Sequence, residues 1–268
     1  SVSALAAACA AILLFWHAER LPPRRLLAGA VATVGLFTIL TGLLDAFPPL
    51  LAAQFVAGGA ATVAYTSALI LLGRLYPDAR ARTRRQGLII GSLGCGPLVG
   101  TPLLRLIASG ASWRMALAAY GALALLAAIV ALVALPDVPP RGASQRRLSD
   151  ALSAARLPVV GPTLLAGLGV WLLWGALGAF LAGYIKHAYA DGAHWIGAFW
   201  AADGVAFGLC SFGGGPLIAR LGRPAHALTV ALLGMLASML AFVWLTPTPF
   251  VSLACFFLWV GLLGLASN

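Results

Sequence analysis

The chain has 268 residues, of which 62% are hydrophobic and 9% are charged, and its mean hydropathy is +0.98. Soluble domains carry about 25% charged residues, because large apolar patches left in water promote association. The composition therefore excludes an ordinary soluble enzyme and indicates that lipid is the solvent for most of the chain. The net charge of +10 could suggest nucleic acid, but such binding needs basic side chains on a soluble face.

Apolar runs near the roughly 20 residues that cross a bilayer recur along the whole chain. The sequence contains nine of them, at 1–18, 26–46, 49–73, 86–108, 112–135, 158–186, 194–218, 225–245 and 249–267. Each run must be helical, because a backbone exposed to lipid has to satisfy its own N–H and C=O groups. We therefore expect an all-α, polytopic membrane protein with about nine transmembrane helices.

The basic residues are distributed unequally over the two sides of the membrane. Loops between successive spans alternate in side, and one side carries 14 of the 17 Lys and Arg residues, whereas the other carries Arg105, Arg114 and Lys186. By the positive-inside rule, the side with 14 faces the cytoplasm. We predict a multi-pass protein of the cell (inner) membrane, with cytoplasmic loops at 19–25, 74–85, 136–157 and 219–224.

The longest loop, 136–157, divides the chain into two bundles, at 1–135 and 158–268. Leu148 and Leu152 lie one helical turn apart within it, which fits a short amphipathic helix on the membrane surface. A solvated linker is an equal alternative. The four cysteines lie inside apolar runs without a close pair, so we expect no metal site and no cofactor.

Two of the cytoplasmic loops repeat each other 200 positions apart, with Arg20-Leu21 in register with Arg220-Leu221. Duplicated helix bundles are a known transporter construction. The loops resemble the signature G-x-L-a-D-R-x-G-R-R of the major facilitator superfamily, which lies after the second helix and, degenerate, after the eighth. The first copy keeps Glu19, Arg20 and Arg24 with Arg25 one position beyond, and the second keeps Gly215, Leu217, Arg220, Gly222 and Arg223.

A second motif lies on the fifth helix of the family's antiporters, as Gly-Pro-x-x-Gly-Gly. Gly96, Pro97 and Gly100 match it, and Thr101 replaces the last glycine. The resemblance covers nearly the whole chain as helices two to ten of twelve, so it implies a fragment of two six-helix bundles. The motif favours export, as in the family's 12-helix drug:proton antiporter branch.

The charged residues of the first loop have a role that the resemblance implies. Glu19 beside Arg20, Arg24 and Arg25 would steady one conformation of the alternating-access cycle, together with the second copy of the motif. Anchoring by positive charge alone is the alternative, and it explains the arginines but not Glu19, since a carboxylate at the membrane surface tends to need a partner.

Asp203 is the acid placed deepest within a predicted span. It follows Trp195 by eight residues, which is roughly 12 Å at about 1.5 Å per residue. At that depth the carboxylate must be protonated, paired or in a watered cavity, and such groups mark proton or substrate paths. We predict a proton-coupling role, with a structural polar partner as the alternative.

The resemblance also implies a central cavity lined by the first, fourth, seventh and tenth helices of the family. The candidates on these helices are Gln54, Gly58, Tyr65, Trp171, Trp174 and Trp259. Such a lining suits apolar, aromatic or cationic small molecules, and packing or lipid-facing aromatic side chains are the alternative. Gln54 stands where proton-coupled exporters commonly have Arg, so it departs from the usual coupling scheme.

Together these features predict a secondary transporter that exports a small amphipathic molecule by alternating access, coupled to proton antiport. An uptake carrier or facilitator for a small metabolite is the first alternative, and a non-transporting helical membrane protein is the second. No sequence resembles a P-loop or a nucleophile elbow, so we expect no enzyme. The expected partners are a small-molecule substrate, protons and the lipid bilayer, with no nucleic acid, and the expected state is a monomer.

Overall fold

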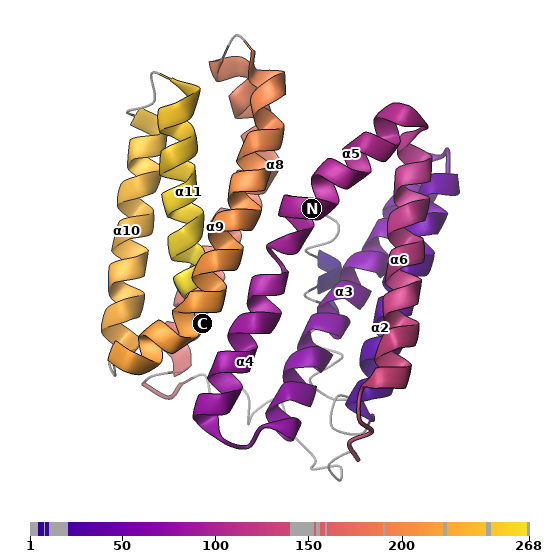
Figure 1. The fold of residues 1–268 in the computed structure, drawn as a ribbon, viewed down its shortest axis with the longest axis horizontal. Helices are drawn as coiled ribbons and strands as arrows, with labels where there is room; N and C mark the ends of the chain where they lie inside the picture. The colour runs from indigo at the N-terminus through magenta and orange to yellow at the C-terminus, as the bar shows by residue number, and fades with distance from the viewer. Residues whose placement is uncertain are drawn as a thin grey trace. The chain divides into compact units, whose positions relative to one another are not determined.

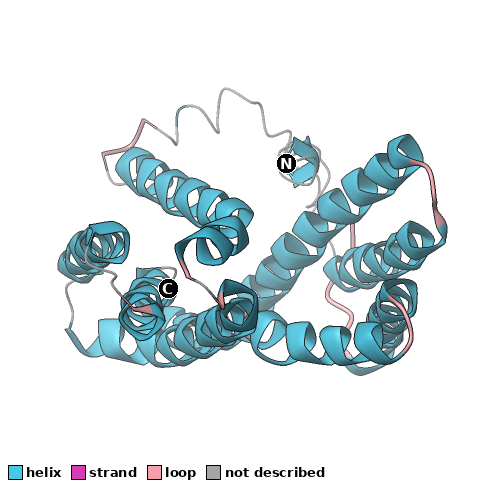
Figure 2. Cartoon of the chain, turned by 90° about the horizontal axis from the view of Figure 1, so that it is seen from above, coloured by secondary structure: helices cyan, strands magenta, loops and turns pink. Residues whose placement is uncertain are grey.

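The structure is a computed structural model, and it describes residues 5–7, 9–10, 21–139, 153, 156–158, 160–189, 191–221, 224–244 and 248–266. The described part is helical and contains no strand (Figure 2), so the expected all-α fold is confirmed. Its elements are α2 (Pro23–Leu43), α3 (Phe47–Leu75), α4 (Ala79–Ser92), η1 (Gly96–Gly100), α5 (Thr101–Gly110), α6 (Trp113–Ala134), α8 (Val160–Ala188), α9 (Gly192–Leu221), α10 (Pro224–Trp244) and α11 (Pro249–Ala266).

Seven helices in the described part are long and apolar enough to cross a membrane. A further helix, the 29-residue α8, covers the predicted span 158–186. Most of the predicted span 1–18 lies outside the described residues, as does most of the 136–157 loop with its predicted amphipathic helix. The membrane character follows from helix length and apolar composition together.

Local chemistry explains where several helices begin. Proline occupies the first turn of α2 and α3, where its missing N–H costs nothing and its fixed φ suits a helix. Ser112 caps α6, because its hydroxyl oxygen accepts a hydrogen bond from the backbone N–H of Met115. These caps lie at the turns that the sequence predicts between spans.

The predicted span 86–108 differs from the observed helices in where it begins and in its local geometry. Helix α4 begins at Ala79, inside the expected loop 74–85, because the Arg-rich stretch is helical rather than extended. The span then changes to a π-helix, η1, at Gly96–Gly100 before α5 continues. Pro97 has no backbone N–H to donate to the hydrogen bonds of the helix, which accounts for the local departure from α geometry.

The described helices divide into two compact units, Ser1–Asp78 with Leu103–Gln145, and Ala79–Pro102 with Arg146–Asn268. Helices α4 and η1 thus belong with the later helices, although they precede the expected bundle boundary at 135. The assignment of 1–135 and 158–268 to two transporter bundles stays a prediction.

In the first unit, α2 packs against both α3 and α6 (Figure 1). Helices α2 and α6 approach closely, because a Cβ added to Gly121 would lie 2.5 Å from the carbonyl oxygen of Gly35. Between helices in lipid, such small-residue contacts replace the hydrophobic drive that water would supply. Asp45 and Arg114 form an ion pair at one end of this unit, and at the other end Arg74 donates to the carbonyl oxygen of Pro139.

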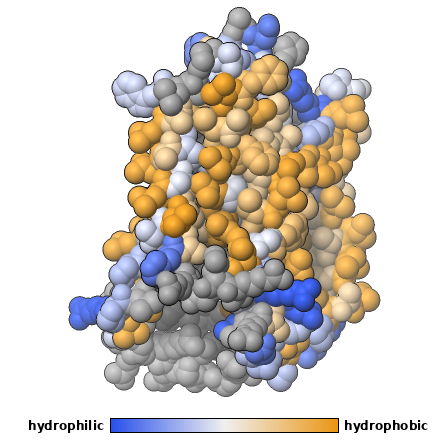
Figure 3. All heavy atoms as spheres, turned by 60° about the vertical axis from the view of Figure 1, so that its left-hand side comes forward, coloured by the Kyte–Doolittle hydropathy of each residue, from blue (hydrophilic) through white to orange (hydrophobic). Residues whose placement is uncertain are grey.

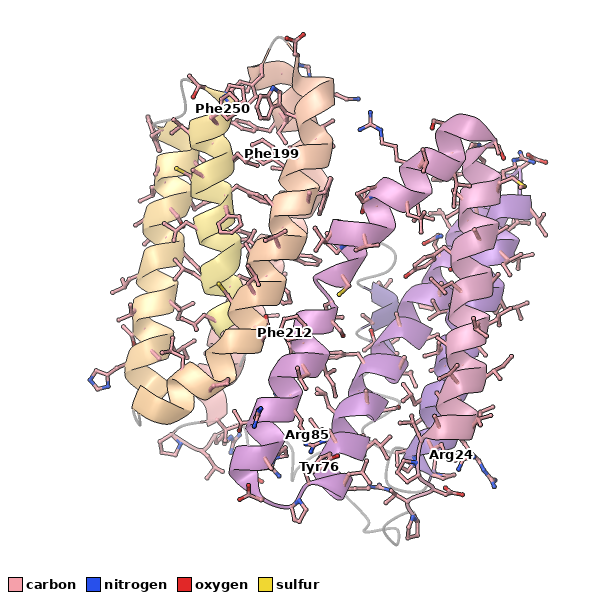
Figure 4. All side chains as sticks on the ribbon, in the orientation of Figure 1. Arg24, Tyr76, Arg85, Phe199, Phe212 and Phe250 are labelled. Atoms are coloured by element: carbon pink, nitrogen blue, oxygen red, sulfur yellow. The ribbon has the colours of Figure 1, made fainter. Side chains whose placement is uncertain are left out.

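In the second unit, α9 packs against α11, α4 and α8, and α10 packs against α11. Aromatic rings dominate the core, where Phe256 contacts Phe199, Phe242 and Trp259 with centroid separations of 5.4 to 6.2 Å. The ring of Phe212 from α9 covers Gly91 of α4 (Figure 4).

Many large apolar side chains point outward, as expected where lipid replaces water. Val133 is 80% exposed and Trp244 is 79% exposed. Figure 3 shows one face of the molecule, which is hydrophobic through its middle and carries hydrophilic residues toward its two ends. This pattern fits helices whose apolar sides meet hydrocarbon and whose ends meet water.

Candidate functional site

Asp203 lies near the middle of the membrane span Trp195–Gly214 within α9. Its exposed fraction is 3%, which makes it a fully buried acid inside the second unit. In the described part of the chain it has no salt-bridge partner. The position predicted from sequence is therefore a buried carboxyl group that forms no ion pair with any described residue.

The hydrogen-bond partner of Asp203 is Trp174, whose indole N–H donates to the carboxylate. This contact joins α8 to α9 and follows the register of the two antiparallel helices. Gly192 at the start of α9 packs against the backbone of Ile185. Two turns farther from the connection between the helices, the ring of Trp200 contacts Gly178. Trp174 and Asp203 are the next pair in that series, one turn beyond Gly178 and Trp200.

Aromatic side chains lie at about the same depth in the second unit as Asp203. Phe199 lies one turn before it on α9, and its ring contacts Phe242 of α10 and Phe256 of α11 (Figure 4). Trp259 stacks on Phe256 and is 1% exposed. A buried carboxylate beside ring faces is poorly solvated, so its charged form depends on the few hydrogen bonds that it receives.

Trp259 is a second indole at the same depth. Helices α9 and α11 run parallel, since Phe199 contacts Phe256 and, farther along both helices, Ser211 donates to the carbonyl oxygen of Gly264 at 3.2 Å. Trp259 lies between these contacts on α11, as Asp203 does on α9. The indole N–H of Trp259 is buried and has no hydrogen-bond partner in the described structure.

The described residues contain no group of three or more His, Cys, Asp or Glu side chains that could hold a metal ion. A carboxyl group can bind and release a proton without such a group of ligands.

Gln54, the candidate on the fourth family helix, lies in the first unit. Its amide Nε2 donates to Thr41 Oγ1 at 3.2 Å, and Thr41 donates in turn to the carbonyl oxygen of Phe37 at 2.8 Å. The carbonyl oxygen of Gly58 accepts from Thr62, and Tyr65 is half-buried on the same helix. The hydrogen bonds thus connect Gln54 to α2, and a cavity role for Gln54, Gly58 and Tyr65 stays a prediction.

The remaining candidates are partly described. Arg24, labelled in Figure 4, and Arg25 lie in the first turn of α2, with Arg24 half-buried and Arg25 exposed. Gly96, Pro97 and Gly100 form η1. Outside the described residues lie Glu19, Arg20, Gly222 and Arg223, together with the side chains of Trp171 and Arg220 and the surroundings of Gly215.

An apolar groove of about 600 Å³ lies between α9 and α11, away from the Asp203 carboxylate. It is lined by Leu209, Cys210, Gly213, Phe257, Gly261 and Leu262, among others. Its lining is almost entirely hydrocarbon, which matches the tails of lipids rather than the polar groups that orient a substrate.

Sequence reasoning missed two partners, Thr41 for Gln54 and Trp174 for Asp203. The sequence makes Trp174 a candidate for the lining of a cavity, not a donor to the acid. The signal available was the short connection between the end of α8 at Ala188 and the start of α9 at Gly192, which makes the two helices antiparallel and places residues before it beside residues after it.

The family model described as Major Facilitator Superfamily matches residues 1–268. None of the curated proteins matches the chain. The match spans both compact units and all of the helices described above.

Proposed function

The chain belongs to the Major Facilitator Superfamily, and from this premise we propose that it is a secondary active transporter that exports a small amphipathic molecule by alternating access, coupled to proton antiport. Members of this family are membrane transporters, and the apolar helices fit a multi-pass membrane protein. Export, coupling and substrate class are the proposed parts. The same proposal holds that the arginine-rich loops face the cytoplasm of an inner membrane and that the protein is a monomer.

The observation that carries the coupling proposal is the burial of Asp203 in the middle of a span. An ionised carboxylate there costs several kcal/mol unless it is compensated, and the described structure offers it one indole donor and no cation. Proton uptake removes that cost, and proton release restores the charge. A group whose protonated and ionised forms differ so strongly in free energy at one site can couple proton movement to a conformational change.

The proposed substrate class follows from the aromatic character of the second unit. Tyr184, Trp195 and Trp200 are half-buried beside the core, and rings of this kind offer flat apolar surface with a polar edge. Few polar groups accompany them, so a mostly apolar molecule fits better than a sugar or a polyanion.

Transport into proteoliposomes tests the proposal, with the protein reconstituted with and without an imposed pH gradient. We expect wild-type flux of a lipophilic test compound to depend on the gradient, and Asp203→Asn to abolish gradient-driven flux while substrate binding remains. Asp137→Asn, an exposed acid after α6, is the matched control and should transport normally. Unchanged gradient-driven flux in Asp203→Asn would remove this residue from the mechanism.

A facilitator or uptake carrier is the second candidate, and the Gln54 contact favours it. An exporter that used a fixed positive charge at this position would need Arg, whereas Gln54 is neutral and hydrogen-bonded to Thr41. Flux that is indifferent to the pH gradient would select this candidate. Absence of flux for every compound tried would favour a protein that does not transport.

A further inference from the structure

The burial of the described side chains of helix α8 changes along its length. Every described side chain between Val160 and Phe180 is exposed or half-buried, whereas Leu181 is 2% exposed and Ile185 is completely buried. A Cβ added at Gly167, Gly169 or Gly175 would meet nothing within 4 Å. Among the described side chains, those that anchor α8 in the core of the second unit thus lie in its C-terminal part, and the described glycines of its N-terminal part make no close contact.

The neighbouring pair α9 and α11 is held differently. A Cβ added to Gly264 would lie 2.7 Å from the carbonyl oxygen of Phe207, and Ser211 is hydrogen-bonded to Gly264. Backbones that approach this closely have little freedom to slide or separate. The part of this unit best suited to move is the N-terminal part of α8.

Trp174 lies in the less buried part of α8, two turns before Leu181. Its hydrogen bond to Asp203 reaches from the loosely held part of α8 to the tightly held α9. Hydrogen bonds to an ionised carboxylate are roughly twice as strong as those between neutral groups. A protonated carboxyl group is a weaker acceptor, so the strength of this tie depends on the proton.

We propose that Trp174 is a positioning residue that holds the N-terminal part of α8 against α9 while Asp203 is ionised and releases it when Asp203 takes up a proton. This rests on the proposed proton-coupling role of Asp203. It assigns to Trp174 a function beyond lining a cavity, since its N–H converts a protonation event into the movement of a helix. The only covalent bond that forms and breaks is the O–H bond of the Asp203 carboxyl group, as the proton binds and leaves.

Other titratable groups lie on the elements around this pair. They are Tyr184, Lys186 and His187 on α8, Cys210 on α9, Cys255 on α11, His226 on α10, Cys95 between α4 and η1, and Arg82, Arg84 and Arg85 on α4. Tyr184 packs on Phe242, and Lys186 and His187 are exposed near the C-terminal end of α8. Cys210 packs against Gly261, two turns beyond Asp203.

The hydrogen bond itself is tested by NMR of the tryptophan indole N–H groups, in detergent and without substrate. The sequence has 8 tryptophans, so the spectrum is simple, and Trp174→Phe identifies the resonance of interest. We expect the Trp174 resonance to shift as pH is lowered in the wild type and to stay constant in Asp203→Asn. Trp259 is the internal control, because its buried N–H has no acceptor in the described structure and should not titrate. A Trp174 resonance that behaves identically in wild type and Asp203→Asn would overturn the proposal.

The movement is tested with spin labels at Leu168 of α8 and Leu209 of α9, which are both exposed. We expect the distance distribution to widen on acidification in the wild type, and Asp203→Asn to show the wide distribution at every pH. Trp174→Phe should also lose the pH dependence. Trp244→Phe is the matched control, since Trp244 is 79% exposed on α10 and its replacement should keep the pH dependence.

The outcomes separate this inference from the proposed function. A titrating Trp174 N–H and a moving α8 in a protein without gradient-driven flux would retain the positioning role and reject proton-coupled export. Gradient-driven flux that depends on Asp203 but survives Trp174→Phe with an unchanged pH profile would retain the export and reject the positioning role. A wild-type distance distribution that does not change with pH would also reject the positioning role of Trp174.

Discussion

Gly94, between α4 and η1, and Gly204 of α9 meet backbone to backbone inside the second unit. A Cβ added to Gly204 would lie 2.5 Å from the carbonyl oxygen of Gly94, and one added to Gly94 would lie 2.6 Å from the carbonyl oxygen of Gly204. Neither neighbour is a flexible side chain that could turn away. The helix pair therefore requires glycine at both positions.

We expect Gly204→Ala to destabilise the protein by about 1–3 kcal/mol, the usual cost of forcing an extra methyl group into a packed contact. Gly213→Ala on the same helix is the control. A Cβ there would meet nothing within 4 Å, so the substitution should stabilise the helix by up to about 1 kcal/mol. Reversible unfolding in mixed micelles measures both changes, and equal effects of the two substitutions would contradict the close approach.

The Gln54 to Thr41 hydrogen bond supplies a second prediction, about helix pairing in the first unit. We expect a double-mutant cycle with Gln54→Ala and Thr41→Val to give a coupling energy of about 0.6 kcal/mol, the average found for hydrogen bonds between helices in a membrane. Thr62→Val together with Gln54→Ala is the control cycle, because Thr62 donates to its own helix at Gly58. A coupling indistinguishable from that control would mean that this hydrogen bond does not join α2 to α3.

Much of the fold could be predicted because the bilayer imposes length and composition on each span. The runs 26–46, 49–73 and 112–135 correspond to α2, α3 and α6 within a few residues. The start of α4 at Ala79 could not be predicted in this way, because a run of arginines is hydrophilic whether it is a loop or the exposed first turns of a helix. Pro97 removes one helical hydrogen bond, but a sequence pattern does not distinguish a kink from the π-helical turn that is observed.

The candidate site was predictable as a position and not as a set of contacts. Asp203 could be placed deep in a span by counting residues from Trp195. Its partner Trp174 depends on which faces of α8 and α9 meet, and helices that are apolar on every side give almost no periodic signal of that. The glycines at 94 and 204 show the same limit, since their pairing requires the register of two distant segments.

The ion pair between Asp45 and Arg114 leads to a prediction of small effect. Both side chains are largely exposed, at 80% and 47%, and water screens such pairs. We expect Asp45→Asn to change the free energy of unfolding by less than about 1 kcal/mol and to change it less at high salt. Unfolding at two ionic strengths measures this, and a large loss that salt does not reduce would show that the pair is more shielded than its exposure indicates.

The two ends of the first unit predict the orientation of the chain in the membrane. Arg74 contacts Pro139 at one end, and Asp45 and Arg114 pair at the other, so residues 46 and 137 should lie on opposite sides. Because 14 of the 17 basic residues fall on the side of residue 137, we expect that side to be cytoplasmic.

Cysteine labelling checks this orientation in a variant whose four native cysteines are replaced. Ala46 and Asp137 are both exposed, so a cysteine at either position can be reached by a reagent. We expect Ala46→Cys to react with a membrane-impermeant maleimide in intact cells, and Asp137→Cys to react only after the membrane is opened. The reverse pattern would invert the topology and place the arginine-rich loops outside. Labelling of both from outside would mean that the three candidate spans between these positions, Phe47–Leu75, Ala81–Gly110 and Trp113–Ala134, do not all cross the bilayer.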